Sequence, residues 1–405
     1  MPNPAAGLFK QLAYKAEATY GTAAGASGAQ LLRRVQSTLD LAKDTYQSNE
    51  IRPDLQVADF RHGVRRVRGK IGGELSAKTY SDFFAAALKR DFATVSAMTG
   101  LGITIAAGVG STYTVTRSSG DFLAAGLKAG MVARLTAGSF NAANLNKNLF
   151  VVGVTATVAT VLVLNGSALV AEGPIASATV TLPGKATYVP TSGHTDKSFT
   201  VEHFYSDLVQ SEQFLGCKVD QIALALPPTG MATIDIDVMG QDVATGGSQY
   251  FTSPTAITTT GVMAAVNGVL RLGGSTVATV TGLSLTIDPN FSGDPVVGSN
   301  KVPFLFPGTV RASGQMTAYF DSVALRDAFI NETEIDMLAA FTADNSAASD
   351  FLAFACPRIK VGGATKNDGQ GGLVQTLPFT ALLNSAGGAG VATEKTTIQM
   401  QDSAA

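Results

Sequence analysis

The chain has 405 residues, and only 15% of them are charged, with 29 basic and 31 acidic side chains. This balance excludes a strong overall field that would draw the protein to nucleic acid or to an anionic membrane. The 43 glycines, the two cysteines and the absence of tryptophan favour many short strands without a disulfide framework, and the length predicts about two domains.

The first 22 residues lack the basic stretch and apolar run of a secretory signal. No segment approaches the roughly 20 apolar residues that span a bilayer. We therefore expect a protein that is made and kept soluble, without a membrane partner.

From Thr38 to Glu74 the sequence predicts a strand, a long polar loop and a second strand. In the second strand Arg66, Arg68 and Lys70 share one face, so that the cations form a stripe. The segment 79–92 predicts a helix that packs on a sheet, with Ser81 able to cap it.

Between residues 97 and 195 the sequence becomes a series of short apolar strands with glycine and asparagine turns. About 100 residues of this kind are enough for a small barrel or sandwich. We expect an inserted all-β domain at 97–195, Ig-like or barrel, and a discontinuous host domain at 1–96 and 196–405.

Residues 214–242 read FLGCKVDQIALALPPTGMATIDIDVMGQD, which predicts two strands joined at a Pro-Pro-Thr-Gly turn. Further strands are predicted around 280–291, with Leu283, Leu285 and Ile287 on one face, and around 309–322, with one polar face. Residues 323–341 suggest a second helix, or a helix and a turn, and 350–363 and 372–383 predict two closing strands.

Asp235 and Asp237 share a face of their predicted strand, about 7 Å apart. They could be a catalytic pair of a carbohydrate-active enzyme, but their flanks supply neither sugar-stacking aromatics nor a reason for a raised pKa. Acids on the polar face of a half-buried sheet are ordinary, so we favour a solvated surface.

Other chemistry is weakly supported. The run from Asp288 to Ser299 resembles a calcium loop, but Ser299 stands where a bidentate glutamate belongs and a strand precedes it. The three histidines, His62, His194 and His203, fit no metal or triad spacing, and no phosphate-binding loop is present. We expect no enzyme activity, no metal and no cofactor.

The stripe of Arg66, Arg68 and Lys70 could bind phosphates. The alternative is cross-strand pairing with acids on the same sheet face. Pairing is favoured because the whole chain is not basic, and the candidate acids are Asp235, Asp237, Glu74 and Glu202.

The order of these pieces resembles the tail tube (major tail) proteins of tailed bacteriophages. The resemblance is carried by QLAYKAEATYGT, by the stretch from SNEIRPDLQ to SDFFAAAL, by the hairpin at 214–242, by the stretch from VTGLSLTIDPNF to MTAYFDS and by FACPRIKVGG. These pieces cover roughly two thirds of the chain, and residues 97–195 are the part that such proteins vary freely.

The resemblance implies a mainly β fold, a β-sandwich or partial barrel with a packed helix, in a structural virion protein. Six copies would form a ring, and rings would stack into a tube that carries the genome into the host bacterium. It also implies partners: a tape-measure protein inside the tube, tail terminator and distal tail proteins at its ends, and double-stranded DNA passing without specific binding. Assembly would take place in the host cytoplasm.

On this interpretation one sheet face lines the lumen, where a polar wall with acids and balanced charge would not hold DNA. The lumen candidates are Thr233, Asp235, Asp237, Arg66 and Arg68. The loop from Gln47 to His62 is the candidate contact with the next ring, through Gln47, Asn49, Glu50, Arg52, Asp54, Asp59 and Arg61.

The domain at 97–195 would decorate the outer wall and obstruct a close-fitting sheath, which favours a flexible non-contractile tail. The main alternative is a capsid-decorating or adhesin-like β protein that does not polymerise through its host domain. A β enzyme using Asp235 and Asp237 is a further alternative.

Overall fold

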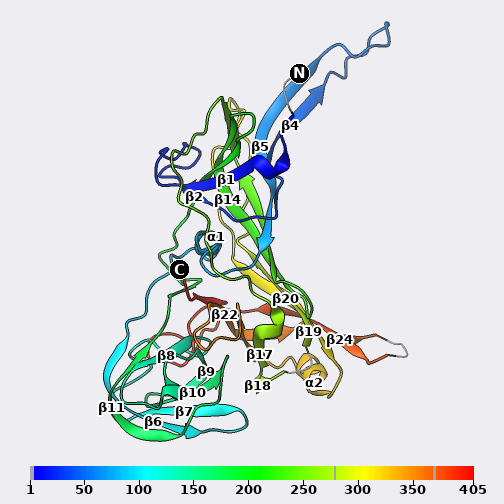
Figure 1. The fold of residues 1–405 in the computed structure, drawn as a ribbon. Coiled ribbons are helices and arrows are strands. Elements are labelled where there is room, and N and C mark those ends of the chain that lie inside the picture. The colour runs from blue at the N-terminus through cyan, green and yellow to red at the C-terminus, as the bar shows by residue number, and fades with distance from the viewer. Residues whose placement is uncertain (1–3, 278–279, 368–370) are drawn as a thin grey trace.

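The computed structural model describes residues 4–277, 280–367 and 371–405 and is mainly β, as the sequence predicts (Figure 1). The molecule is elongated, with a hairpin at one end and a barrel at the other (Figure 1). In the described residues no helix has the length and apolar character needed to cross a membrane.

A small antiparallel sheet lies near the hairpin end. Its order is β2–β1–β13–β14–β16, and its strands are β1 (Lys10–Ala16), β2 (Gln30–Leu31), β13 (Phe199–Tyr205), β14 (Gln210–Leu226) and β16 (Asp242–Gly246). The helix α1 (Ser81–Ala87) packs on it, with the ring of Phe83 4.7 Å from that of Tyr14 and 5.2 Å from that of Phe199.

A long antiparallel sheet shares strand β14. Its order is β4–β5–β15–β14–β19–β20–β24, and its further strands are β4 (Asp40–Gln47), β5 (Phe60–Glu74), β15 (Thr233–Gly240), β19 (Val280–Asp288), β20 (Arg311–Tyr319) and β24 (Val374–Ala381). The short β3 (Gln36–Ser37) adds to β5. Strand β14 leaves β16 after Leu215 and joins β15 at Lys218, and Gly216 between them has a φ of +67° that favours glycine.

The chain then continues into a second layer. Strand β22 (Phe351–Val361) pairs with β24 and with β21 (Ile335–Thr342), and β21 pairs with β17 (Gly268–Leu272). Short strands complete this layer: β12 (Lys185–Tyr188), β18 (Ser275–Thr276), β23 (Thr365–Lys366) and β25 (Gln399–Asp402).

The main core fills the space between the long sheet and this second layer. Ile236 of β15, Leu285 of β19 and Leu377 of β24 come from one side, and Met337 of β21 and Phe354 of β22 from the other. Period-2 alternation explains the long-sheet residues, because the odd and even positions of a strand face opposite sides. The predicted apolar faces of 280–291 and 309–322 are confirmed within β19 and β20.

Between Met98 and Thr181 the chain forms a closed barrel of the order β10–β7–β6–β11–β8–β9. Its strands are β6 (Met98–Ala107), β7 (Thr112–Arg117), β8 (Val132–Ala137), β9 (Leu149–Val154), β10 (Val158–Val163) and β11 (Glu172–Thr181). The barrel has its own core, with Ile103 and Val151 fully buried. We call the rest of the described chain the body.

The barrel is fixed to the body. A third apolar cluster joins Val132 and Phe150 of the barrel to Leu338, Phe351 and other residues of β21 and β22. Strands β21 and β22 therefore bury both of their faces, one in the main core and one under the barrel. A strand covered on both faces reads as a continuous apolar run, which is the pattern of MLAAF and FLAFAC.

One local prediction is wrong, and another is confirmed only in part. Ser81 is the first helical residue rather than the cap: Tyr80 occupies the N-cap without a side-chain bond, and the Ser81 hydroxyl donates to Asp402 (2.7 Å). In 323–341 the predicted helix is confirmed as α2 (Ala324–Ile330), and the turn that follows it leads into strand β21, which the sequence analysis did not predict. Strand β21 was not predicted because apolar residues occupy consecutive positions in it. That pattern fits a helix as well as a buried strand.

Three 3-10 turns complete the described elements: η1 (Gly7–Phe9), η2 (Ala142–Asn144) and η3 (Ala265–Asn267). Both cysteines, Cys217 and Cys356, are buried and free.

Candidate functional surfaces

Strand β15 sets Asp235 and Asp237 on the face opposite the core. Ile234, Ile236 and Val238 alternate with them and are almost completely buried, whereas the two acids are partly exposed. The predicted Pro-Pro-Thr-Gly turn follows the end of β14 at Leu226, and β15 begins at Thr233. Thr233 is exposed on the same face as the acids.

A single lysine lies within ion-pair distance of both acids. Lys70 of β5 lies opposite Asp237, and its Nζ is 3.7 Å from Asp235 Oδ2 and 3.7 Å from Asp237 Oδ1. Because these groups are partly exposed, each ion pair contributes at most about 1 kcal/mol to stability. The arrangement is the cross-strand pairing predicted for the basic stripe.

Some of the other predicted cross-strand partners of the basic stripe are found, and others are not. Arg66 lies beyond the end of β15, and its guanidinium is 3.5 Å from Asp44 of β4. Arg68 lies opposite Met239 and forms no ion pair within the described residues. Glu74 is opposite Thr233. Glu202 is wrong as a partner, because it is buried in β13 and accepts hydrogen bonds from the backbone N–H groups of Tyr250 and Phe251.

The polar side chains continue across the long sheet from β5 to β24. Pairing places Thr286 opposite Ser313, Ser313 opposite Thr380, and Asp288 opposite Arg311. We call this surface the polar face; it consists of Arg68, Lys70, Gln221, Thr233, Asp235, Asp237, Ser284, Thr286, Asp288, Arg311, Ser313, Gln315, Thr317, Thr376 and Thr380. It carries acids, bases, hydroxyls and amides together, on a sheet whose opposite face is core.

Sequence reasoning missed Asp220 beside this face. It occupies a register shift of β14 between Val219 and Gln221, so simple alternation does not place it. Burial raises the pKa of Asp220, the charges of Asp288 and Asp237 raise it further, and Arg68 lowers it.

The described residues contain no group of three or more His, Cys, Asp or Glu arranged to hold a metal ion. His203 is buried, and its Nε2 lies 2.8 Å from Ser37 Oγ. Burial, and then the charges of Lys10 and Arg34, lower its pKa to about 3. A base this weak is poorly suited to take a proton from serine near neutral pH.

The second candidate surface is the hairpin of β4 and β5, which projects from the body (Figure 1). The predicted loop is shorter than expected, because Gln47 ends β4 and Arg61 belongs to β5, opposite Tyr46. Of the remaining candidates, Asn49 and Glu50 are exposed in the loop, Arg52 pairs with Asp54 (2.8 Å), and Asp59 pairs with Arg61 (2.8 Å).

The hairpin tip is also apolar, which the sequence analysis did not recognise. Ile51 is 102% exposed, Leu55 94% and Val57 64%. Exposed apolar side chains are normal singly, but several on one projecting loop make it a candidate contact surface. Because these apolar residues alternate with charged ones, the sequence pattern of the loop does not indicate an apolar surface.

An open polar sheet face and a projecting hairpin with an apolar tip are features that suit a protein which assembles with other chains. The family model described as phage tail tube protein matches residues 10–381. The chain therefore belongs to the phage tail tube protein family and is a structural component of the virion tail. No curated protein matches the chain significantly.

Proposed function

We propose that six copies of this chain close into a ring, and that stacked rings form the hollow tube through which the genome enters the host bacterium. The observation that carries the proposal is the polar face. It is a wide sheet surface, continuous over six strands, whose mixed charge gives DNA phosphates little net attraction. On this proposal Thr233, Asp235, Asp237 and Arg68 line the lumen, and Arg66 lies at its rim.

Ring closure would use the open sheet edge. Strand β4 pairs with β5, and among the described residues no strand covers its other edge from Asp40 to Gln47. An exposed strand edge is a liability in a monomer, and a closed ring removes it.

Stacking would use the hairpin tip. A loop that projects beyond its own layer can reach the adjacent ring, and burial of Ile51, Leu55 and Val57 there would supply apolar contact. The charged residues Glu50, Arg52, Asp54, Asp59 and Arg61 would then surround an apolar centre, as in many protein interfaces.

The layer order supports an outer position for the barrel. From the polar face the layers run through the long sheet, the main core, strands β21 and β22, and finally the barrel. If the polar face lines the lumen, the barrel lies on the opposite side. We propose that the barrel, which makes up most of the predicted insert 97–195, is an outer domain, whereas β12 within that range belongs to the body. We also propose that the tail is non-contractile, since outward barrels would obstruct a sheath.

The proposed partners follow from a tube. A tape-measure protein would occupy the lumen during assembly in the host cytoplasm, terminator and distal tail proteins would close the ends, and DNA would pass without specific binding.

Electron microscopy of the purified protein tests the proposal. Uniform hollow tubes built from sixfold rings are the expected result. Rings of another symmetry would refute the hexamer alone, whereas dispersed monomers at all concentrations would refute tube formation and favour a decorating or adhesin-like protein.

A further inference from the structure

An apolar groove lies at the end of the long sheet that is opposite the hairpin of β4 and β5. Its volume is about 430 Å³. The long sheet contributes Leu226 and Val280 to its walls, and the region around β17 and β18 contributes Val269 and Val277. Val266, which also lines the groove, is 79% exposed. None of the described residues that line the groove is charged, so its surface suits apolar side chains.

The register of the long sheet separates this groove from the hairpin tip. Strand β5 begins at Phe60, beside the tip, and ends at Glu74, which is opposite Thr233. Thr233 also pairs with Ala225, the neighbour of Leu226 in the groove. Because β5 has 15 residues, the tip and the groove are roughly 45 Å apart within one chain, and Figure 1 shows β4 far from β17. The tip therefore cannot reach the groove of its own chain.

The tip and the groove are complementary in charge. The tip segment 48–59 contains three acidic residues and one basic residue. Its Glu50 is exposed and forms no ion pair within the described part of the chain. Arg271 of β17 lies at the edge of the groove, where its guanidinium is 3.4 Å from Oγ1 of the lining residue Thr276. Arg271 likewise has no carboxylate partner among the described residues.

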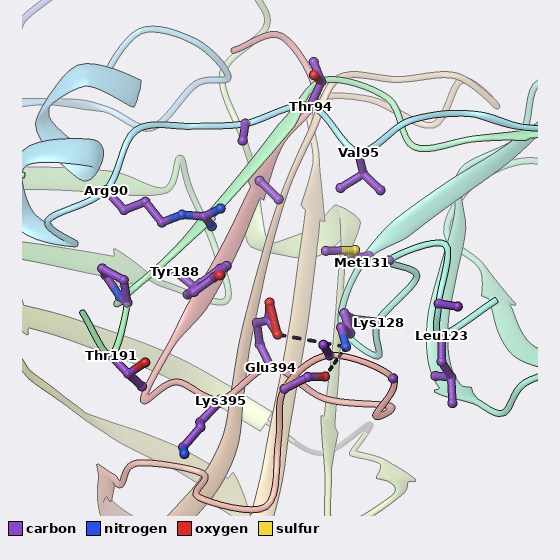
Figure 2. Close-up of a pocket in the computed structure, with 18 of the residues that line it drawn as sticks. Arg90, Thr94, Val95, Leu123, Lys128, Met131, Tyr188, Thr191, Glu394 and Lys395 are labelled. Atoms are coloured by element: carbon purple, nitrogen blue, oxygen red, sulfur yellow. Dashed lines mark hydrogen bonds and ion pairs between the residues drawn. The ribbon is translucent and has the colours of Figure 1, made fainter. Parts of the chain in front are cut away.

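A second concave surface is a poorer match for the tip. The cleft where the barrel meets the body has a volume of about 900 Å³ (Figure 2). It contains the charged residues Arg90, Lys128, Glu394 and Lys395, and Figure 2 shows the ion pair between Lys128 and Glu394 (4.0 Å). Covering these charges with apolar side chains would remove them from water at a cost in free energy. The uncharged groove carries no such cost.

The positions of the tip and the groove suit copies that stack in one direction. Each copy then places one end against the opposite end of the next copy, so the contact joins two different surfaces of the same chain. A head-to-tail contact of this kind can repeat without limit. The tip exposes apolar side chains at one end, and the groove exposes apolar walls at the other. Burying both would be favourable.

We propose that the tip segment 50–57 of one copy enters the groove of a second copy of this chain in the adjacent ring. Ile51, Leu55 and Val57 supply the apolar contact, and Glu50 lies beside Arg271 of the second copy. The inference rests on the proposed stacking of rings, and it names the surface that receives the tip.

Disulfide cross-linking of the full chain tests this contact. Both native cysteines are buried, so they contribute little background. Leu55→Cys/Val266→Cys, oxidised with copper phenanthroline, should give a ladder of covalent multimers, because each copy is joined to the next. The matched control Leu55→Cys/Val109→Cys has its second thiol on an exposed loop of the barrel and should give at least roughly tenfold less multimer, since its thiols are not held together.

A charge exchange tests the polar part of the contact. Glu50→Lys and Arg271→Glu, each added to the cysteine pair, should lower the yield of the ladder severalfold. Combining them should restore the yield, because the opposite charges are then exchanged between the copies. A folding defect in either variant would not be repaired by the other, so restoration separates contact from stability. Unchanged yields in both single-charge variants would overturn the pairing of Glu50 with Arg271.

Electron microscopy of the same samples separates this inference from the proposed function. Tubes without a ladder would overturn the docking of the tip in the groove and leave the tube proposal standing. A ladder without tubes would support the docking and refute the closed ring, and absence of both would overturn both proposals.

Discussion

The side-chain amide of Gln401 in β25 makes a pair of hydrogen bonds with the backbone of Val132 in β8. Its oxygen accepts from the Val132 N–H (2.7 Å) and its nitrogen donates to the Val132 carbonyl oxygen (3.1 Å). A side chain here takes the place of a neighbouring strand, and it joins the barrel to the body with both groups buried.

Replacement Gln401→Leu keeps the volume but leaves the two Val132 groups without these partners. An unsatisfied buried backbone group costs about 1–3 kcal/mol, so we expect the free energy of unfolding to fall by at least about 2 kcal/mol. Urea denaturation measures this change. Gln210→Leu at an exposed position is the control and should change stability by less than about 0.5 kcal/mol.

Gly130 tests how closely the barrel approaches the body. Its φ is +85°, and a Cβ added there would overlap the Cβ of Ala355. Gly110 also has a positive φ, +65°, but an added Cβ would meet nothing within 4 Å. Both alanine variants carry the same kind of backbone strain, so their difference isolates the contact.

We expect Gly130→Ala to lower the melting temperature clearly more than Gly110→Ala, by the equivalent of roughly 1–3 kcal/mol. Equal effects would mean that the barrel and the body can move apart enough to accept the added Cβ without loss of stability. That result would contradict a fixed junction.

His203 predicts acid sensitivity. Its ordinary pKa is 6.5, and burial with Lys10 and Arg34 lowers it to about 3 in the folded protein, while Glu212 Oε2 lies 4.0 Å from Nδ1. The unfolded chain therefore takes up a proton first as the pH falls, and stability is lost between about pH 6.5 and 3.

Between pH 7.5 and 5 this linkage amounts to roughly 2 kcal/mol. Denaturation of the wild type and of His203→Gln at both pH values gives the test. The variant should lose that much less stability on acidification, and parallel losses in the two proteins would show that His203 is not the sensitive group.

Substitutions at the hairpin tip should impair assembly without affecting the folding of the chain. Ile51→Asp and Leu55→Asp alter exposed side chains, so the stability of the free chain should change by no more than about 0.5 kcal/mol. Tube formation should be lost, because a buried unpaired carboxylate would be placed between rings.

Val109→Asp is the matched control for this prediction. Val109 is 91% exposed in the loop between β6 and β7 of the barrel, and tubes should form normally with the variant. Normal tubes from Ile51→Asp and Leu55→Asp would place ring contact elsewhere.

The polar face predicts an effect on genome release. In Asp235→Asn/Asp237→Asn, Lys70 loses both nearby acids, and the wall gains positive charge that attracts DNA phosphates. We expect virions to assemble and DNA release to slow, with the slowing reduced at high salt.

Asp294→Asn removes an exposed acid outside the polar face and is the control, which should assemble and release DNA normally. A lower yield of assembled virions from the double variant, with normal DNA release from those that form, would assign the acids to an interface instead.

Alternation was sufficient to predict the faces of β5, β15 and β20, because the side-chain period of a strand is two and one face is core. It failed at Asp220, where a register shift interrupts the period. It also could not show that Gln401 meets Val132, since these residues are 269 positions apart and only the tertiary fold brings them together.

Some features of the candidate surfaces could likewise be predicted from the sequence, and others could not. The pairing of Lys70 with Asp235 and Asp237 follows from residue types and parity, whereas the partner of Arg66 depended on where β15 ends. The apolar tip at Ile51 and Leu55 was hidden because exposure depends on how far the hairpin projects, which local sequence does not encode.

Strand β14 runs through both sheets of the body without interruption, turning at Gly216. Pulling the small sheet away from the long one would therefore load a covalent backbone as well as its hydrogen bonds. In a long, bending filament made of such subunits, strain would be expected to concentrate at the contacts between chains, and each body would move as one mechanical unit.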